Sequence, residues 1–388
     1  MIKTLEELSL TKGEYGGGFS AVDYSEDKPR YIRITDIKEG GELKKDTKSP
    51  SGTEKDWKKY KLVEGDILFA RSGATVGKTF LYEEKYGDCI YAGYLIRFKP
   101  NTKIAYPKYV YYYTRTPKYN AWVLNKQNVV AQPNINAKQY GTELKIPLPP
   151  LPTQKKIAAL LDAADAYRQK TKALIEKYDE LTQSLFLDMF GDPVVNEKGW
   201  EKVQLSKLCS FDKMSVKPDD IKEGETYLGL ECIEKMTGNI LNKFTVHAGE
   251  LKSNKFWFNK DYILYGKLRP YLNKVAVPTF EGVCSTDIIP IKPIKNITTK
   301  EFITSLMRGD WFVSFADERS SGANLPRISP REVEKYRSIN PPFPLQNQFA
   351  EHVQKIEAQK AQAQESLEKA EELFNSLLGR AFKGEVSI

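Results

Sequence analysis

A glycine-containing loop at residues 72–79 has the residue types of a phosphate-binding loop but not their spacing. It reads Ser-Gly-Ala-Thr-Val-Gly-Lys-Thr. A Walker A loop needs a glycine, four further residues and then Gly-Lys-Thr, followed by a helix whose N-terminus holds phosphate. Ser72 occupies the place of the first glycine, and the residues after Thr79 resemble strands. We therefore expect no ATP site, and we keep Arg71 and Lys78 as candidate contacts to a phosphate or base.

A second motif, Asn340-Pro341-Pro342-Phe343, matches the tetrad with which DNA amino-methyltransferases hold their target amino group. The tetrad falls on a proline-rich segment that the chain repeats, and the first copy has Leu148 in place of the asparagine. No FxGxG nucleotide-binding loop precedes it. Methyltransferase activity therefore remains only a less favoured alternative.

The remaining residue types give no catalytic constellation. The four cysteines lie far apart without a CxxC pair, and the chain has two histidines, so the usual zinc spacings are absent. No run of 18 apolar residues occurs, and the N-terminus lacks the apolar region of a secretory signal. We expect a reduced, cytoplasmic binding protein with no catalytic residue, cofactor or metal of its own.

Length and charge point to several domains and an anionic partner. At 388 residues the chain is long enough for two or three domains, and its net charge is +8. The segments 154–190 and 346–384, which we expect to form long helices, are close to neutral. The excess of basic residues therefore lies in the rest of the chain. Phosphate backbones are a common partner for such surfaces, whereas the alternative is a mildly basic, solvated surface.

The chain repeats itself at about half its length. Residues 31–37 (YIRITDI) correspond to residues 227–233 (YLGLECI), and residues 148–152 (LPPLP) correspond to 340–344 (NPPFP). The spacing between copies falls slowly from 196 to 192 residues along the chain. Several matches in the same order indicate duplication of a whole module.

Each module begins with short strand-like runs separated by Gly, Pro, Asn and Asp, with helices expected at 107–116 and 300–315. A proline-rich segment then leads into a long helix, for which Thr153 is a suitable N-cap. The resulting domains are 1–146, 147–192 (hinge and helix), 193–339 and 340–388 (hinge and helix).

Both long helices show apolar residues at heptad spacing, which is typical of a coiled coil. Two helices of this length, each with one seam, are expected to pack against one another; the alternative is that each packs on its own globular domain. The predicted seam consists of Ile157, Leu160, Ala164, Tyr167, Thr171, Leu174, Tyr178, Leu181 and Leu185, and of Val353, Ile356, Lys360, Ala363, Leu367, Ala370, Phe374 and Leu377.

This organisation resembles the specificity (S) subunit of a Type I restriction-modification system. The resemblance extends over essentially the whole chain and includes GDILFARSGATVGKT at 65–79, AQPNINAKQY at 131–140, PLPPLPTQKKIAALL at 147–161, YILYGKLRPYLNKVAV at 262–277 and SSGANLPRISPREVE at 320–334.

The resemblance implies an α+β fold in which two duplicated mixed α/β target recognition domains are separated by two long antiparallel helices with pseudo-two-fold symmetry. It also implies that the chain reads a bipartite, asymmetric site in double-stranded DNA. Its helices would dock two methyltransferase (M) subunits and, through them, restriction (R) subunits. S-adenosylmethionine, ATP and Mg would be bound only by those partners. A protein-interaction scaffold without DNA remains the main alternative, and we expect no membrane association.

Candidate DNA contacts are the polar side chains of loops that correspond across the repeat and lie near Gly or Pro turns. Arg, Lys, Asn and Gln fit guanine and adenine edges, although some of these residues could instead cap turns, Asn134 and Asn324 above all. The candidates are Arg71, Ser72, Lys78, Gln127, Asn128, Gln132, Asn134 and Asn136 in the first domain, and Lys267, Arg269, Tyr271, Lys274, Arg319, Ser321, Asn324 and Arg327 in the second.

Overall fold

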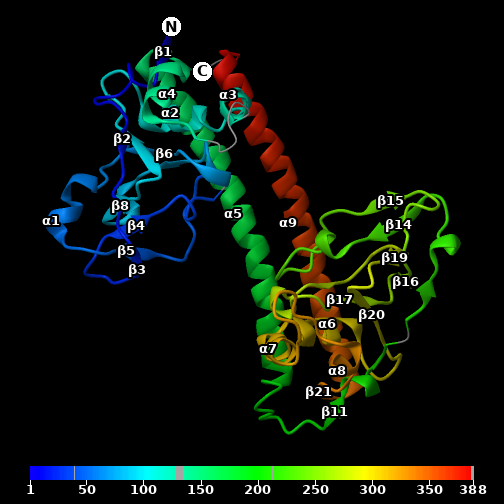
Figure 1. Ribbon diagram of the computed structural model, residues 1–388. Coiled ribbons are helices and arrows are strands. Elements are labelled where there is room, and N and C mark those ends of the chain that lie inside the picture. The colour runs from blue at the N-terminus through cyan, green and yellow to red at the C-terminus, as the bar shows by residue number, and fades with distance from the viewer. Residues whose placement is uncertain (39, 128–133, 212, 386–388) are drawn as a thin grey trace. The chain divides into compact units, whose positions relative to one another are not determined.

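The computed structural model describes residues 1–38, 40–127, 134–211 and 213–385 of the chain (Figure 1). It divides into two compact units, Met1–Lys170 with Leu367–Ile388, and Thr171–Ser366. Each unit therefore contains one globular region together with half of each long helix. The predicted mixture of helices and sheets is confirmed.

The first unit is built around a four-stranded antiparallel sheet in the order β2-β9-β6-β7. Smaller pairs surround it: β1 with β10, β3 with β5, and β4 with β8, the last of them parallel. The strands are β1 (Ile2–Thr4), β2 (Glu14–Tyr15), β3 (Ala21–Asp23), β4 (Arg30–Ile32), β5 (Lys48–Pro50), β6 (Ile67–Ala70), β7 (Thr79–Leu81), β8 (Cys89–Tyr91), β9 (Leu95–Phe98) and β10 (Lys145–Pro147).

The second unit repeats this topology. Its four-stranded sheet has the order β12-β20-β17-β18, β11 pairs with β21, and β14 pairs parallel to β19 inside a five-stranded sheet, β13-β16-β19-β14-β15. The duplication read from the sequence is thus present in the fold. The strands are β11 (Lys202–Gln204), β12 (Cys209–Ser210), β13 (Ser215–Val216), β14 (Glu225–Leu228), β15 (Phe244–Val246), β16 (Lys255–Phe258), β17 (Ile263–Gly266), β18 (Val275–Ala276), β19 (Gly282–Cys284), β20 (Ile288–Pro293) and β21 (Arg337–Ile339).

Short helices join each sheet to the long helices. The expected helices at 107–116 and 300–315 are confirmed, although the second is broken at Gly309. The helices of the first unit are α1 (Glu54–Trp57), α2 (Pro107–Tyr113), α3 (Pro117–Gln127) and α4 (Ala137–Glu143), and those of the second are α6 (Lys300–Arg308), α7 (Asp310–Glu318) and α8 (Pro330–Glu334).

The long helices α5 (Leu151–Phe190) and α9 (Phe343–Lys383) complete the core of both units. In the first unit, Ile157 and Leu161 of α5 share a buried cluster with Phe374 and Leu378 of α9. In the second, Phe186 of α5 shares a cluster with residues from the beginning of α9. The start of α5 therefore meets the end of α9, and the end of α5 meets the start of α9, which is the predicted antiparallel pairing.

The predicted N-cap of α5 is wrong. The helix already begins at Leu151, so Thr153 lies within its first turn. Prolines at 150 and 152 explain the earlier start, because the first turn of a helix needs no hydrogen bond from those nitrogens and proline fixes φ near its helical value.

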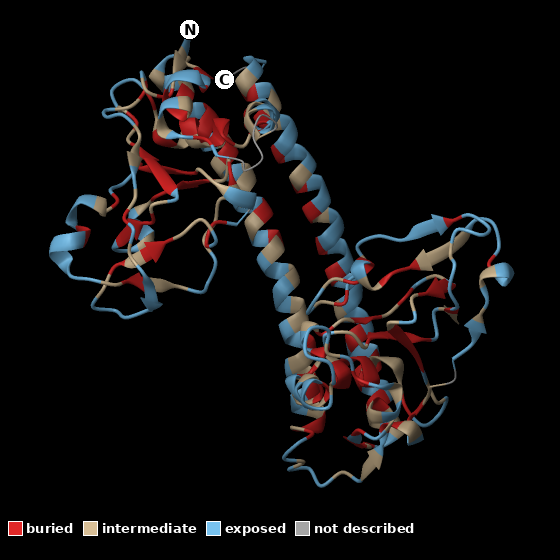
Figure 2. Cartoon of the chain, in the orientation of Figure 1, coloured by how far each residue is buried: buried red, intermediate tan, exposed pale blue. Residues whose placement is uncertain are grey.

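The predicted seam of α9 is buried at most positions, although Ile356 and Leu377 are only partly buried, whereas the seam of α5 needs correction. Lys360, Ala363, Leu367, Ala370 and Phe374 are all buried, and red patches mark the buried positions along the helix in Figure 2. In α5, however, Tyr167, Leu174 and Leu181 are 55%, 44% and 49% exposed, and Leu160 is only partly buried.

The predicted residues Ile157 and Thr171 are buried, but elsewhere the buried stripe of α5 lies one residue later, at Leu161, Arg168 and Thr182. The sequence pattern favoured the apolar choice at each turn, but packing places polar residues inside. The Arg168 guanidinium lies 4.5 Å from the centre of the Phe374 ring and bonds to Asp165. This partnering makes burial of the cation tolerable.

Two buried glutamines, one per repeat, join each long helix to its globular region. The Gln154 side chain accepts a hydrogen bond from the Tyr106 amide (2.8 Å) and donates to the carbonyls of Ile104 (2.9 Å) and Pro149 (2.8 Å). Gln346 accepts from the hydroxyl of Thr298 (2.8 Å) and donates to the carbonyl of Pro341 (2.8 Å). Both glutamines are fully buried.

Candidate nucleic-acid interface

In each unit, three loops converge beyond one end of the four-stranded sheet. In the first unit the loop after β6 is bonded to the other two: the Arg71 amide donates to the Tyr94 carbonyl (3.0 Å), and the Ile135 amide donates to the Arg71 carbonyl (2.8 Å). In the second unit the Lys267 amide donates to the Asp287 carbonyl (2.9 Å), and the Ile328 amide to the Lys267 carbonyl (3.1 Å). The backbone frame is therefore the same in both copies.

The loop that resembles a Walker A motif belongs to this frame. Residues Gly73–Thr75 form one 3-10 turn, and strand β7 follows instead of a helix. The chain reverses at Gly77, which has φ of +89° and whose added Cβ would clash with Val123. The expected strands after Thr79 are confirmed, and the loop lacks the helix terminus that a phosphate-binding loop requires.

The side chains in the first unit place a cation between an aromatic ring and an amide. The Arg71 guanidinium lies 4.8 Å from the centre of the Tyr15 ring, and its Nε donates to Asn134 Oδ1 at 3.4 Å. Asn134 is exposed, and Tyr15 and Tyr94 are 43% and 62% exposed. Such a group can offer stacking and hydrogen bonds to a ligand.

The side chains in the second unit surround a carboxylate. Asp287 lies 3.9 Å from Lys267 Nζ and 3.4 Å from Arg327 Nε. Burial lowers the pKa of the Lys267 ammonium below its usual value, because desolvation outweighs the attraction of Asp287. Ser321 and Arg327 exchange two backbone hydrogen bonds of 2.9 Å and close a hairpin that carries exposed Asn324. Arg269 is exposed beside this hairpin with φ of +53°, and its amide donates to the Pro326 carbonyl.

The structure thus gathers some of the candidates and gives others local partners. Arg71, Ser72 and Asn134 meet in the first unit, as do Lys267, Arg269, Ser321 and Arg327 in the second. Asn128 and Gln132 lie outside the described residues. The other candidates lie apart from these groups. Asn136 caps α4, while Gln127 and Lys274 donate to the carbonyls of Val76 and Leu230. Arg319 lies over the Phe315 ring, Tyr271 is exposed on the next turn, and Lys78 is partly buried in its loop.

Tyr15, Tyr94 and Asp287 were not among the sequence candidates. Tyr94 and Asp287 occupy the same position of the repeat, directly before the strand-like segments at 95–98 and 288–293. The signal that could have found them is this alignment, since the position carries an aromatic ring in one copy and a carboxylate in the other.

The tetrad at Asn340–Phe343 serves the fold through its backbone. The Asn340 amide donates to the Glu201 carbonyl at 2.8 Å, the Pro341 carbonyl accepts from Gln346, and Phe343 is the first residue of α9. Within the described ranges, no group of three or more His, Cys, Asp or Glu residues could hold a metal ion. No helix described in the structure is both long and apolar enough to cross a membrane.

A matching family model and two relatives in sequence are described as Type I restriction specificity domains or subunits. A family model named "Type I restriction modification DNA specificity domain" matches residues 17–178. The EcoDI specificity subunit of a type I restriction enzyme from Escherichia coli is 26% identical over 283 residues, which are 63% of this chain and 63% of that protein. The EcoBI specificity subunit of the same species is 25% identical over 164 residues, 41% of this chain and 34% of its own. The sequence match to EcoDI thus spans less than two thirds of that relative.

Solved structures share the fold over nearly the full length. The S subunit of a Type-I restriction-modification system from M. genitalium superposes with a TM-score of 0.55 at 14% identity, covering 98% of this chain and 96% of that one. A chain from a structure concerned with assembly and conformational transition of the type I R-M system gives a TM-score of 0.51 at 14% identity, covering 100% and 98%.

Proposed function

We propose that this chain, which belongs to the family of Type I restriction-modification specificity subunits, recognises a two-part DNA sequence. Each globular region reads one half of that sequence. The observation that carries this proposal is the duplicated loop frame, in which corresponding backbone bonds hold Arg71 in one unit and Lys267 in the other. Repeated frames with different side chains suit two half-sites of different sequence.

The side chains at the two frames offer different chemistry. The first unit supplies Arg71 and Asn134 together with exposed tyrosines, a set that favours hydrogen bonds to purine edges and stacking. The second unit supplies Arg327 and Lys267 around the Asp287 carboxylate, which can accept a hydrogen bond from a cytosine amino group. We therefore expect the two half-sites to differ.

The chain's role is recognition, and chemistry is assigned to partners. The Walker-like loop lacks its helix and the methyltransferase-like tetrad is engaged in backbone contacts. We assign S-adenosylmethionine, ATP and Mg to methyltransferase and restriction subunits, and we place the complex in the cytoplasm.

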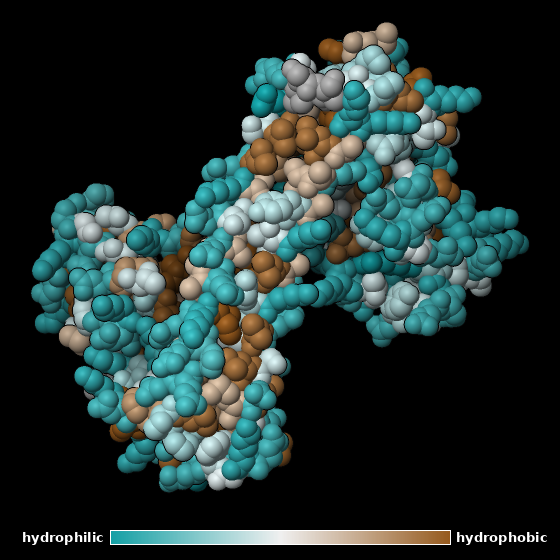
Figure 3. Space-filling view, turned by 180° about the vertical axis from the view of Figure 1, so that it is seen from behind, coloured by the Kyte–Doolittle hydropathy of each residue, from teal (hydrophilic) through white to brown (hydrophobic). Residues whose placement is uncertain are grey.

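A second apolar stripe on α5 supports docking of a helical partner. Leu174 and Leu181 follow one another at heptad spacing and are 44% and 49% exposed. Figure 3 shows a mainly hydrophilic surface interrupted by separate hydrophobic patches. A heptad-spaced exposed stripe is suited to a further helix, and we propose a methyltransferase subunit as its source.

The test is DNA binding by matched alanine variants. Arg71→Ala and Arg269→Ala should each weaken binding to the cognate duplex by about 1–3 kcal/mol. Lys103→Ala and Lys295→Ala serve as controls, because these exposed lysines follow β9 and β20 at the ends of the strands away from the loop frames. Fluorescence anisotropy at several salt concentrations measures both affinity and the salt slope. Wild-type affinity in both loop variants would refute the choice of loops, and a flat salt slope would favour a protein-interaction scaffold.

A further inference from the structure

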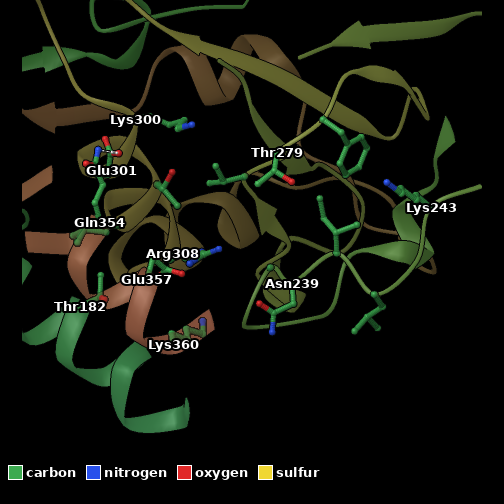
Figure 4. Close-up of a pocket in the computed structure, with 18 of the residues that line it drawn as sticks. Thr182, Asn239, Lys243, Thr279, Lys300, Glu301, Arg308, Gln354, Glu357 and Lys360 are labelled. Atoms are coloured by element: carbon green, nitrogen blue, oxygen red, sulfur yellow. Dashed lines mark hydrogen bonds between the residues drawn. The ribbon is translucent and has the colours of Figure 1, made fainter. Parts of the chain in front are cut away.

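The second unit contains a cavity whose counterpart in the first unit is about half as large. It has a volume of about 850 Å³ and lies between α6, the facing parts of α5 and α9, and the loops at 238–243 and 277–280. In Figure 4, Arg308, Glu357 and Lys360 lie on one side, whereas Asn239, Thr279 and Lys243 lie on the other. A volume of this size is typical of a small-molecule site.

In the first unit, aromatic side chains occupy part of the position that corresponds to this cavity. The corresponding space, of about 430 Å³, is lined by Tyr111 of α2, Arg168 of α5 and Phe374 of α9, with Arg115 beside them. The Phe374 ring has the Arg115 guanidinium 5.1 Å and the Arg168 guanidinium 4.5 Å from its centre. The Tyr111 hydroxyl donates to the Gly40 carbonyl at 3.2 Å. Two aromatic rings and two arginines thus pack together.

In the second unit the cations are kept and the rings are lost. Along the repeat, Arg115 corresponds to Arg308 and Arg168 to Lys360, whereas Tyr111 corresponds to Thr304 and Phe374 to Thr182. All four of the second unit's residues line the cavity. Two missing aromatic side chains beside two retained cations therefore account for part of the larger volume.

The lining has polar groups that lack partners or face the space. Thr304 is 7% exposed, and within the described part of the chain its hydroxyl has no hydrogen-bond partner. The Arg308 guanidinium donates to the Val275 carbonyl through Nε (3.2 Å) and Nη2 (2.9 Å). Burial lowers the pKa of Arg308 below its ordinary value, because the cation is desolvated. A desolvated, partly buried cation beside a buried, unpaired hydroxyl favours a polar occupant over a purely apolar one.

The charge of the lining favours an anion. Lys243, Lys300, Arg308 and Lys360 line the cavity against Glu301 and Glu357. Lys360 is neutralised by its ion pair with Asp179, which leaves three cations facing two carboxylates. Lys243 Nζ lies 4.8 Å from the centre of the Phe280 ring at the rim, and Figure 4 shows it reaching inward from the side opposite Arg308.

We propose that this cavity binds a purine nucleotide. Its base occupies the space of the two missing rings, stacked on Arg308 and bonded at its edge to the Thr304 hydroxyl, and its phosphates meet Lys243. Guanidinium stacking on an aromatic ring and lysine contact to phosphate are both established modes of recognition.

The purine nucleotide in this cavity could come from two sources, a free nucleotide or a nucleotide within a nucleic-acid strand. Titration of ADP into the full chain, with and without saturating duplex DNA, distinguishes them. ADP binding that DNA leaves unchanged identifies a free nucleotide, whereas competition by DNA identifies a strand. Both results require that ADP itself binds.

The test uses calorimetric titration of the full chain with ADP and with adenosine. Thr182→Phe restores the ring that the first unit has and should abolish binding of both, while Thr182→Ser keeps the cavity open and should bind as wild type does. Lys243→Met should weaken ADP binding about tenfold and leave adenosine unchanged. Thermal melting checks folding, and Thr304→Tyr is the second filling variant should Thr182→Phe prove unstable.

The outcomes decide the proposal. Loss of ADP binding in a folded filling variant, with binding kept by Thr182→Ser, supports it. Absence of saturable ADP binding by the wild type up to about 1 mM, which is a binding free energy near −4 kcal/mol, overturns it. ADP binding that both filling variants retain overturns it as well.

Discussion

Replacing Gln154 by leucine should destabilise the first unit, because this side chain connects the start of α5 to the segment before α2 through two hydrogen bonds and to the preceding hinge through a third. Its loss leaves the Tyr106 amide and the carbonyls of Ile104 and Pro149, which are partly buried against this fully buried side chain, without that partner. Each buried group left unsatisfied costs about 1–3 kcal/mol. Partial relief by water and the apolar gain of leucine reduce the sum, so we expect a loss of about 3–5 kcal/mol in the free energy of unfolding.

The assay is thermal and urea unfolding of the full chain, with hydrogen exchange to locate the effect. For a unit of this size a loss of 1 kcal/mol lowers Tm by about 2–4 °C, so the shift should be near 10 °C. Faster exchange should concentrate in the residues around Ile104–Tyr109 and the first turns of α5. Gln346→Leu should produce the equivalent effect in the second unit, where Gln346 bonds to Thr298 and Pro341.

Gln364→Leu is the matched control, since Gln364 is exposed on α9, and it should change stability by less than about 0.5 kcal/mol. A loss below about 1 kcal/mol for Gln154→Leu, or an effect no larger than that of the control, would refute the reasoning that these glutamines join the helices to the globular regions.

Two further predictions concern charged groups. Lys360→Met should destabilise the second unit by about 1–2 kcal/mol, because Lys360 Nζ pairs with Asp179 Oδ1 at 2.5 Å and only 10% of the lysine side chain is exposed. Urea unfolding measures this loss, and adding Asp179→Asn to the Lys360→Met variant should recover most of it. Glu223→Gln should lower the pKa of His247, which the bond to Glu223 raises above 6.5. Since the raised pKa belongs to the folded state, the stabilisation is complete below about pH 6.5 and is lost as pH rises through the folded value; NMR titration of the imidazole resonances follows it, and an unchanged pKa in the variant would contradict it.

Much of the architecture was predictable because the duplication repeats the same weak pattern of strand-like runs in both halves of the chain. Short strand-like runs are ambiguous alone, but their recurrence in the same order gave two equivalent modules, and the proline segments placed the long helices to within a few residues. The α9 seam was predictable at most positions since, apart from Lys360, its inward residues are apolar side chains between charged or polar neighbours.

The α5 seam was predicted only in part, because tertiary packing overrode hydrophobicity at several turns. Inward positions hold Arg168 and Thr182, while Leu174 and Leu181 face outward. A pattern of residue types cannot tell that Arg168 finds Phe374 and Asp165 around it. Nor can it tell that Leu174 and Leu181 belong to a different surface.

The candidate interface was predictable only as a set of loops. Arg71 and Lys267 were found since the repeat aligned their loops, but the residues whose carbonyls accept their backbone amides, Tyr94 and Asp287, come from another segment that only the folded sheet brings near. Lys274 and Asn136 illustrate the opposite error, because their side chains bond to local backbone in ways that residue type does not reveal.

The most direct test of the central claim is methylome sequencing of cells that express this chain with the methyltransferase subunit proposed as its partner. Two chains would be compared, the natural one and one whose residues 1–146 come from another family member. The account predicts a motif of two different halves separated by a spacer, of which the exchanged chain changes one half and keeps the other. A motif that changes in both halves, or one that is continuous without a spacer, would contradict the assignment of one half-site to each unit.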